Sequence, residues 1–282
     1  MAPTAESFCE VWGSPVAHSL SPALHRAAYE VLGLDWDYRY RDVTSETLAL
    51  TWEQRGSALA GLSLTMPLKE DIVALVEAGD PIVAKLQAAN TVYRVDGVPT
   101  LSNTDPFGVE QALGHHGVSA DYAWILGAGA TARAVGYALL QRGTTRVTLC
   151  VRNPERAHHT AEVMSHWGLD FEVVPLTELD SVDLPQLVAS TLPGNAEGLP
   201  TMPARVVATA ALFDVAYSPW PSAFAHQWGN SPQPIVSGLW MLAYQALAQI
   251  RLFVHGDVSR PLSAEDAVFR AMTDAVGLNS GS

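Results

Sequence analysis

The segment Gly127-Ala-Gly-Ala-Thr-Ala132 follows an apolar strand pattern over 122–126 and precedes a helical pattern over 131–141. Strand, glycine-rich turn and helix in this order form the dinucleotide-binding fingerprint. The first glycine allows the tight turn, the second lets the backbone approach a pyrophosphate, and the helix N-terminus offers free N–H groups to the phosphates. The stretch therefore predicts a nucleotide-binding α/β domain with cofactor contacts from Gly127, Ala128, Gly129 and Ala130.

The end of the next predicted strand, 146–151, indicates which nucleotide binds. An NAD site usually places Asp or Glu there to accept hydrogen bonds from the ribose 2′-hydroxyl. This chain instead has Arg152-Asn-Pro-Glu-Arg156. Two guanidinium groups can hold a 2′-phosphate bidentately, whereas a carboxylate would repel it. We therefore predict NADP as the cofactor, bound by Arg152, Asn153 and Arg156.

Strand and helix patterns alternate along the rest of the chain, which is typical of βαβ units and a mostly parallel sheet. A length of 282 residues fits two domains. We predict an α/β fold in which residues 1–104 and 237–282 form a substrate-binding and catalytic domain and residues 105–236 form a Rossmann-like NADP-binding domain. Expected strands cover 8–12, 38–43, 59–64, 91–95, 100–102, 122–126, 146–151, 171–174, 187–190 and 212–215. Expected helices cover 22–32, capped by Ser21, and 44–55, capped by Thr44, then 80–89, 105–116, 131–141, 154–167, 238–254 and 264–276.

Composition and charge exclude several classes of protein. The 16 basic and 29 acidic residues give a net charge of −13 without a basic cluster, so nucleic acid is not an expected partner. No segment approaches the roughly 18 apolar residues of a membrane span, and the first eight residues lack the features of a signal peptide. Cys9 and Cys150 fall in predicted buried strands without metal-ligand spacing. We expect a cytoplasmic protein, monomer or homodimer, that binds a small molecule and has no metal site.

Lysine is rare in this chain, because 14 of the 16 basic residues are arginines and only Lys69 and Lys85 are lysines. Arginine does not release its proton near neutral pH, whereas a partly desolvated lysine can. Lys69 closes the loop-like run Gly61-Leu-Ser-Leu-Thr-Met-Pro-Leu-Lys69, which follows a predicted strand. This position is a candidate for proton transfer.

Four polar runs lie near predicted strand ends or helix starts: His18–Pro22, Leu64–Lys69, Ala89–Thr91 and Asn103–Asp105. Each has a structural explanation by itself: Ser21 and Asp105 as helix caps and Asn90 as a turn residue. Together they supply hydroxyls, an amide, an ammonium and a carboxylate where α/β sheets gather ligands. This set suits a small polyhydroxylated acid.

With these runs the chain resembles the shikimate dehydrogenases over nearly its whole length. The residues that carry the resemblance are Gly13–His25, Leu64–Lys69, Ala89–Thr91, Asn103–Asp105, Gly127–Gly129, Asp214–Pro219 and Gly238–Gln245. The resemblance implies two α/β domains that flank a cleft, with the last helices returning to the first domain. It also implies NADP-dependent interconversion of shikimate and 3-dehydroshikimate in aromatic amino acid biosynthesis.

The resemblance further implies a role for each matching residue. Lys69 and Asp105 would be the catalytic pair, with Lys69 donating or accepting the proton of the hydroxyl that reacts. Ser19 and Ser21 would hold the substrate carboxylate, and Tyr217 would line the cleft. The ring hydroxyls would be bound by Thr65, Asn90, Asp105 and Gln245, and the nicotinamide half of the cofactor would lie near Thr191, Gly238 and Met241.

The chain departs from the common pattern at a few positions. Ser63 stands where an asparagine is common, Pro106 and Ala130 stand where glycines are common, and Val151 replaces an asparagine. Three alternatives stay open. They are a quinate or quinate/shikimate dehydrogenase that uses NAD, a non-catalytic dinucleotide-binding regulator on the same scaffold, and a methylene-tetrahydrofolate dehydrogenase, which lacks the His-Ser-Leu-Ser run. Retention of Lys69 and Asp105 argues against the regulator.

Overall fold

A computed structural model describes residues 7–194, 196 and 198–278. Its internal contacts divide the chain into two compact units, which we call the first unit (Met1–Thr104 with Gln245–Ser282) and the second unit (Asp105–Tyr244). By these contacts, the chain returns to the first unit at residue 245. The reason is that one continuous helix, α9 (Gly238–His255), contributes its beginning to the second unit and its remainder to the first.

The first unit is built on a mixed six-stranded sheet with the order β2-β1-β3-β5-β6-β4. Its central strand β1 pairs in parallel with β2 and β3, while β5 runs antiparallel to β3 and β6. The β5–β6 hairpin turns at Asp96 and Gly97, both with positive φ, a conformation that an Asp-Gly pair favours. The strands are β1 (Phe8–Gly13), β2 (Asp37–Asp42), β3 (Leu59–Leu64), β4 (Ala78–Gly79), β5 (Thr91–Val95) and β6 (Val98–Ser102).

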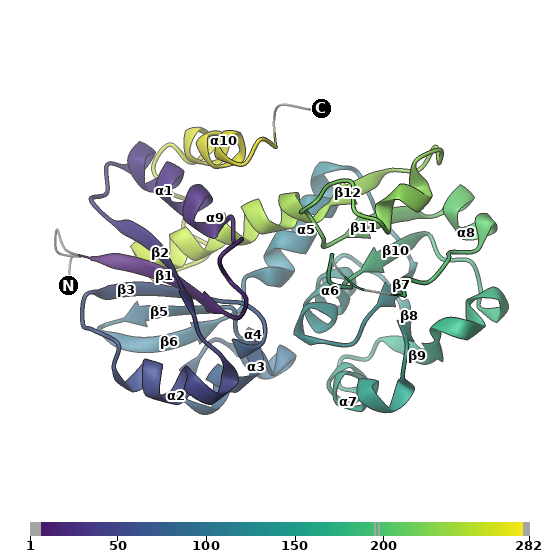
Figure 1. The fold of residues 1–282 in the computed structure, drawn as a ribbon, viewed down its shortest axis with the longest axis horizontal. Coiled ribbons are helices and arrows are strands. Elements are labelled where there is room, and N and C mark those ends of the chain that lie inside the picture. Colours follow the sequence, from purple (N-terminus) through teal and green to yellow (C-terminus); the bar gives the residue numbers. More distant parts are fainter. Residues whose placement is uncertain (1–6, 195, 197, 279–282) are drawn as a thin grey trace. The chain divides into compact units, whose positions relative to one another are not determined.

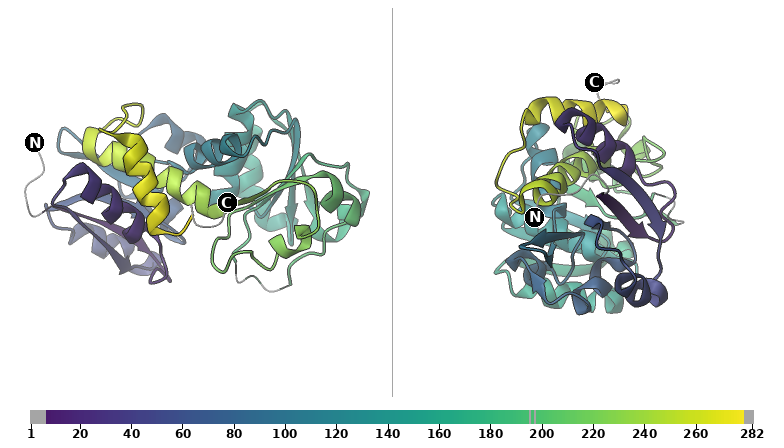
Figure 2. Two further views of the ribbon diagram at one scale, coloured as in Figure 1. Left: turned by 90° about the horizontal axis from the view of Figure 1, so that it is seen from above. Right: turned by 90° about the vertical axis from the view of Figure 1, so that its left-hand side faces the viewer.

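Helices cover both faces of this sheet. Within the first unit, Figures 1 and 2 show α1, α10 and the end of α9 on one face and α2, α3 and α4 on the other. On the second of these faces, Trp12 and Leu62 of the sheet pack with Leu48 and Trp52 of α2 in a buried apolar cluster. The helices are α1 (Ser21–Leu32), α2 (Ser45–Glu53), α3 (Leu68–Asp71), the 3₁₀ turn η1 (Ile72–Ala74), α4 (Pro81–Leu86) and α10 (Glu265–Ala275).

The second unit has a parallel six-stranded sheet with the order β12-β11-β10-β7-β8-β9. Separate apolar clusters cover its two faces, one around α5 and α6 and the other around α8 and Trp228, which agrees with strands buried on both sides. The strands are β7 (Tyr122–Leu126), β8 (Arg146–Val151), β9 (Asp170–Pro175), β10 (Leu187–Ser190), β11 (Ala211–Asp214) and β12 (Ile235–Ser237). The helices are α5 (Asp105–His115), α6 (Ala130–Gln141), α7 (His158–Ser165) and α8 (Ala204–Thr209), with 3₁₀ turns η2 (Pro154–Ala157), η3 (Leu176–Ser181) and η4 (Ala225–Trp228).

The structure confirms the predicted α/β class and corrects several local expectations. The helix expected over 80–89 ends at Leu86 because Gln87 adopts a left-handed conformation. The helix expected over 154–167 is a 3₁₀ turn followed by α7. Ser21 is not a cap, since it is the first residue of α1 and its side chain makes no capping bond. Thr44 does precede α2, and its amide donates to Thr47 Oγ1 over 3.0 Å.

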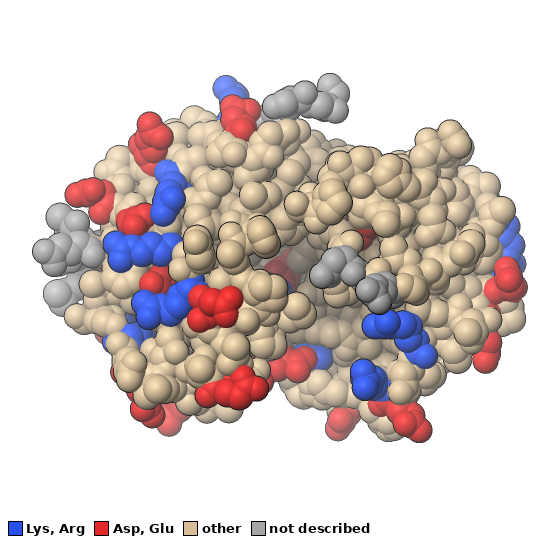
Figure 3. Space-filling model, viewed as in Figure 1, with Lys and Arg blue, Asp and Glu red and all other residues tan. Residues whose placement is uncertain are grey.

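Charged side chains are dispersed over the surface. On the face drawn in Figure 3, most Lys and Arg groups lie beside Asp or Glu groups. Ion pairs of this kind link Asp37 to Arg26 and Arg39, and Arg146 to Glu172. A search of the described helices finds none with the length and hydropathy needed to cross a membrane.

Candidate functional site

Polar residues of the first unit meet at one edge of its sheet, where β1, β3 and β6 end and the antiparallel β5 begins. Ser19 and Ser21 follow β1, and Thr65 follows β3. Gly13 brings the two segments together, because a Cβ atom at this position would overlap the Thr65 side chain and the Met66 carbonyl oxygen. Ser19 Oγ accepts the Ser21 amide over 3.3 Å, so the loop after β1 turns directly into α1.

Asn90 lies at the same edge and is held on both sides of its amide. Its Oδ1 accepts the Thr104 backbone N–H at 2.8 Å and the Thr91 hydroxyl at 2.6 Å. Its Nδ2 donates to Thr104 Oγ1 at 3.0 Å and to Gln245 Oε1 at 3.2 Å. Gln245 reaches this point from α9. The structure thus places two predicted substrate-binding residues, far apart in the sequence, in direct contact.

The predicted catalytic residues lie in the first turns of two helices. Lys69 is half-buried in the short helix α3, and its carbonyl oxygen accepts the Ala89 amide over 2.7 Å, which joins its loop to the segment that carries Asn90. Asp105 is buried and begins α5 immediately after Thr104. Pro106 occupies the first turn of that helix, where its missing N–H costs no hydrogen bond.

A buried polar layer lies behind this edge. Tyr38 is fully buried, stacks on His25 with 4.0 Å between ring centroids, and donates its hydroxyl hydrogen to Ser63 Oγ over 2.6 Å. His25 Nδ1 and the Tyr29 hydroxyl lie 3.2 Å apart. Burial lowers the pKa of His25 to about 3, so its ring is neutral at physiological pH.

In the second unit, the glycine-rich turn borders a hollow of about 410 Å³ at the carboxyl ends of β7 and β8. Gly127 has a φ of +107°, and a Cβ atom there would overlap Thr191 Oγ1. Gly129 differs, because a Cβ atom there would have no neighbour within 4 Å. This open space next to the helix N-terminus fits the close approach of a pyrophosphate. Residues lining the hollow include Gly127, Ala128, Val151, Arg152, Asn153 and Arg156.

Arg152 and Arg156 are exposed at this hollow, and no ion pair of either is found within the described part of the chain. Asn153 Oδ1 accepts the Glu155 amide over 3.0 Å and thereby caps the turn η2 that carries Arg156. No Asp or Glu appears among the residues that line the hollow. The donor set therefore fits a phosphate at the adenosine end of a dinucleotide.

The residues predicted near the nicotinamide lie after β10 and on α9. Thr191 follows β10, and its hydroxyl donates to the Leu126 carbonyl over 2.7 Å. Gly238 begins α9 against the Val215 carbonyl, where no side chain would fit. Met241 is buried on the same helix. Tyr217 is half-buried after β11, and burial raises the pKa of its hydroxyl.

Sequence reasoning missed residues that support the glycine-rich turn. Thr160 of α7 donates its hydroxyl hydrogen to the Ala128 carbonyl over 2.7 Å, and the buried Arg133 donates to Thr160 Oγ1 over 3.3 Å. Leu176 and Leu192 supply apolar walls of the hollow. No motif marks these residues, because their contacts depend on the packing of α6 against α7.

The two cysteines are not candidate nucleophiles. Both are free thiols inside the sheets. Burial raises the pKa of Cys9 to about 12 and also raises that of Cys150 strongly, which keeps both protonated. Within residues 7–194, 196 and 198–278 there is no group of three His, Cys, Asp or Glu side chains that could hold a metal ion.

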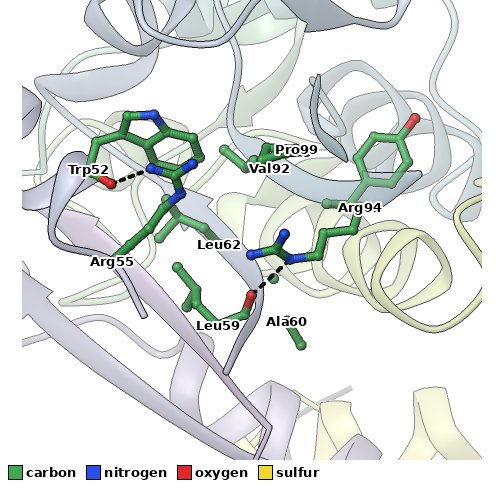
Figure 4. A pocket seen from close by; sticks show the side chains of 10 residues that line it. Trp52, Arg55, Leu59, Ala60, Leu62, Val92, Arg94 and Pro99 are labelled. Atoms are coloured by element: carbon green, nitrogen blue, oxygen red, sulfur yellow. Dashed lines mark hydrogen bonds between the residues drawn. The ribbon is translucent and has the colours of Figure 1, made fainter. Parts of the chain in front are cut away.

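Another pocket lies at the opposite end of the first unit's sheet, where β3 begins (Figure 4). It is lined by Trp52, Arg55, Leu59 and Arg94, among others. The Arg55 guanidinium stacks on the Trp52 ring at 3.5 Å and donates to the Trp52 carbonyl, while Arg94 donates to the Leu59 carbonyl over 3.3 Å. None of the predicted site residues is among those lining this pocket.

Comparison with known protein families assigns the first unit. Residues 11–92 match the model of the shikimate dehydrogenase substrate binding domain. This range contains the loop after β1, the loop after β3 and Asn90.

Curated relatives and solved structures match over nearly the full length. The chain is 35% identical over 265 residues to the shikimate dehydrogenase (NADP(+)) of Thermus thermophilus, covering 93% of this chain and 97% of the relative. It is 34% identical over 250 residues to that of Natronomonas pharaonis, covering 86% and 90%. The crystal structure of a shikimate 5-dehydrogenase from Thermus thermophilus in complex with NADP(H) and shikimate matches with a TM-score of 0.79 at 32% identity, covering 95% and 99%.

Proposed function

The chain belongs to the shikimate dehydrogenase family, and from this membership we propose that it catalyses the NADP-dependent, reversible reduction of 3-dehydroshikimate to shikimate. This activity makes it an oxidoreductase of aromatic amino acid biosynthesis. One observation carries the proposal. The polar residues assigned to shikimate by the resemblance are present, and those of the first unit gather at one edge of its sheet.

The first unit is the substrate-binding part in this proposal. The hydroxyls of Ser19 and Ser21 bind the carboxylate, while Thr65, Asn90 and Gln245 bind the ring hydroxyls. Groups that hydrogen-bond a hydroxyl reject analogues without it strongly, since they are left without a partner. We also expect Tyr217 to contribute to substrate binding.

NADP, when bound, supplies or accepts the hydride. In the direction of reduction, the Lys69 ammonium donates a proton to the oxygen of the developing alkoxide. In the direction of oxidation, the neutral amine of Lys69 accepts that proton. The Asp105 carboxylate orients the ammonium group and the reacting hydroxyl. Thr191, Gly238 and Met241 position the nicotinamide.

The second unit selects the cofactor in this proposal. Arg152 and Arg156 bind the 2′-phosphate, with Asn153 holding the turn between them. Ala128, Gly129 and Ala130 bind the pyrophosphate through backbone N–H groups, while Gly127, whose N–H donates to the Cys150 carbonyl, provides the tight turn. An NAD-linked enzyme would gain nothing from two guanidinium groups at this position, so we expect NADP to be preferred.

A spectrophotometric assay with two substrate pairs tests the proposal. We expect kcat/KM for shikimate with NADP to exceed that for quinate with NAD at least about 100-fold, since two bidentate charge-assisted contacts are lost with NAD. Faster turnover of quinate with NAD would favour the quinate dehydrogenase alternative. NADP binding without turnover of either substrate would identify a non-catalytic regulator.

A further inference from the structure

We propose that Gln249, with Ser63 and Tyr38, forms a positioning network that determines the orientation of the Asn90 side-chain amide. This inference rests on the proposed function. Gln249 lies on α9, one helical turn beyond Gln245, and its side chain turns into the interior of the first unit. In this role it does not touch the substrate. It acts through Asn90 on the recognition of a ring hydroxyl.

The network is a continuous chain of hydrogen bonds. Tyr38 donates to Ser63 Oγ at 2.6 Å, and Ser63 donates to Gln249 Oε1 at 2.8 Å. Gln249 Nε2 donates to the Asn90 carbonyl at 3.0 Å and to Thr91 Oγ1 at 3.0 Å. The Thr91 hydroxyl then donates to Asn90 Oδ1 at 2.6 Å.

Backbone groups determine which atom donates and which accepts in each hydrogen bond of this network. The Asn90 main-chain carbonyl can only accept, so the side chain of Gln249 must present its NH₂ group there and its oxygen to Ser63. Because Thr91 Oγ1 accepts from that NH₂ group, the Thr91 hydroxyl hydrogen is available for Asn90 Oδ1. The Thr104 backbone N–H, which can only donate, selects the same Asn90 oxygen at 2.8 Å.

The consequence is that Asn90 presents its NH₂ group toward Gln245 Oε1, while its oxygen faces the Thr104 backbone N–H. A substrate hydroxyl that takes the place of one partner of this NH₂ group would accept a hydrogen bond from Asn90. Tyr38 connects the network to the carboxylate site, because the side chain of Ser21 lies near its hydroxyl. The same buried layer thus holds residues proposed for both ends of the substrate.

Burial gives the network its rigidity. The exposed fractions are 0% for Tyr38, 4% for Ser63, 1% for Gln249 and 2% for Asn90. A buried amide that loses a partner cannot exchange it for water, so removing one link leaves its neighbours unsatisfied or lets them reorient.

Gln249→Met tests the inference, since it keeps the length of the side chain and removes both polar groups. We expect KM for shikimate to rise about tenfold while kcat stays within about threefold, because one hydrogen-bond orientation is lost from ground state and transition state alike. Discrimination, measured as the ratio of kcat/KM for shikimate to that for an analogue lacking the ring hydroxyl bound by Asn90, should fall about tenfold. KM for NADP should not change.

Gln227→Met is the matched control. Gln227 hydrogen-bonds the Met202 amide and the Pro200 carbonyl in the second unit, away from the network. The same substitution there should leave both KM for shikimate and the discrimination ratio within about twofold of the wild type.

Tyr38→Phe keeps the inference testable if Gln249→Met does not fold. It removes one hydroxyl, keeps the ring beside His25, and should shift KM in the same direction by a smaller factor. Where both variants fold, the effects of the double variant should be smaller than the product of the two single effects, since both act through one chain. If folded Gln249→Met and Tyr38→Phe both keep the wild-type KM for shikimate and the wild-type discrimination ratio, the inference about the network is wrong, while the proposed function stands. A wild type that neither binds nor turns over shikimate would overturn the proposed function with it.

Discussion

The proposed substrate site of the first unit and the proposed cofactor site of the second unit differ in how their polar side chains are held. In the first unit, Asn90 is buried and already paired with protein groups whose polarity is determined by the backbone. In the second unit, Arg152 and Arg156 stand exposed at a hollow lined by glycine-rich backbone. Hydroxyl recognition needs donors and acceptors in a definite orientation, whereas phosphate recognition needs charge that can reach the ligand. The difference predicts that changes in the first unit alter substrate selectivity and chemistry, and that changes in the second alter cofactor choice.

The largest effect is expected for Lys69→Ala. We expect kcat to fall about 10²- to 10⁴-fold, the range for loss of a general acid, with KM for shikimate within about threefold. Lys85→Ala, the same substitution at the chain's other lysine, should leave steady-state kinetics within about twofold. A Lys69→Ala enzyme with near-normal turnover would remove this residue from the mechanism.

The cofactor half of the comparison is tested by Arg152→Gln and Arg156→Gln. Each should raise KM for NADP about 10- to 100-fold, the equivalent of a charge-assisted hydrogen bond, and leave KM for NAD unchanged. Arg146→Gln serves as the control, because Arg146 pairs with Glu172 and Asp183 at the other end of β8. Equal losses with NADP and NAD would show that the two arginines do not select the cofactor.

Two glycines in the same turn are expected to have different roles, Gly127 in stability and Gly129 in cofactor binding. Gly127→Ala should destabilise the protein by about 1–3 kcal/mol, because its φ is +107° and the new methyl would overlap Thr191. Gly129→Ala should leave the melting temperature within about 2 °C and raise KM for NADP about tenfold, since its methyl would enter open space proposed for the pyrophosphate. Thermal unfolding and cofactor titration of both variants test this separation of roles. Equal melting temperatures of the two variants would contradict it.

The smallest effect concerns pH and belongs to the buried layer of the first unit. The pKa of His25 is lowered by burial from 6.5 to about 3, so below pH 6.5 the unfolded chain binds a proton that the folded chain does not. Stability is therefore lost as pH falls, by about 1 kcal/mol between pH 6.5 and 5.5 from this group. His25→Phe should flatten that slope in urea unfolding followed over this range. An unchanged slope would mean that His25 has the same pKa in the folded and the unfolded protein.

How far the sequence predicts the molecule depends on whether a feature is local. The glycine-rich turn, the Asp96-Gly97 hairpin and most strands follow from neighbouring residues, and the structure confirms them. The strand β12 was missed, because its three residues lie at the end of a Pro/Gly-rich stretch and are defined only by pairing with β11.

The candidate site shows the same limit. The end of a predicted strand correctly indicated that Thr65 would lie at this edge of the sheet. Asn90 precedes β5 and reaches the same edge because β5 runs antiparallel to β3, which no local pattern predicted. The expected cap at Ser21 was wrong, because Ser21 is already the first residue of α1 and Leu20 precedes the helix. The contacts of Gln249 with Ser63 and Asn90 span 186 and 159 residues of sequence, and no local pattern predicts such pairs.

The passage of α9 from the second unit into the first has a consequence for synthesis on the ribosome. The nascent first unit lacks Gln245, Gln249 and the helix α10, which packs on α1, until the second unit has been translated. We expect its polar interior to remain open to water during that time, and the edge proposed to bind shikimate to form only after the second unit has emerged from the exit tunnel.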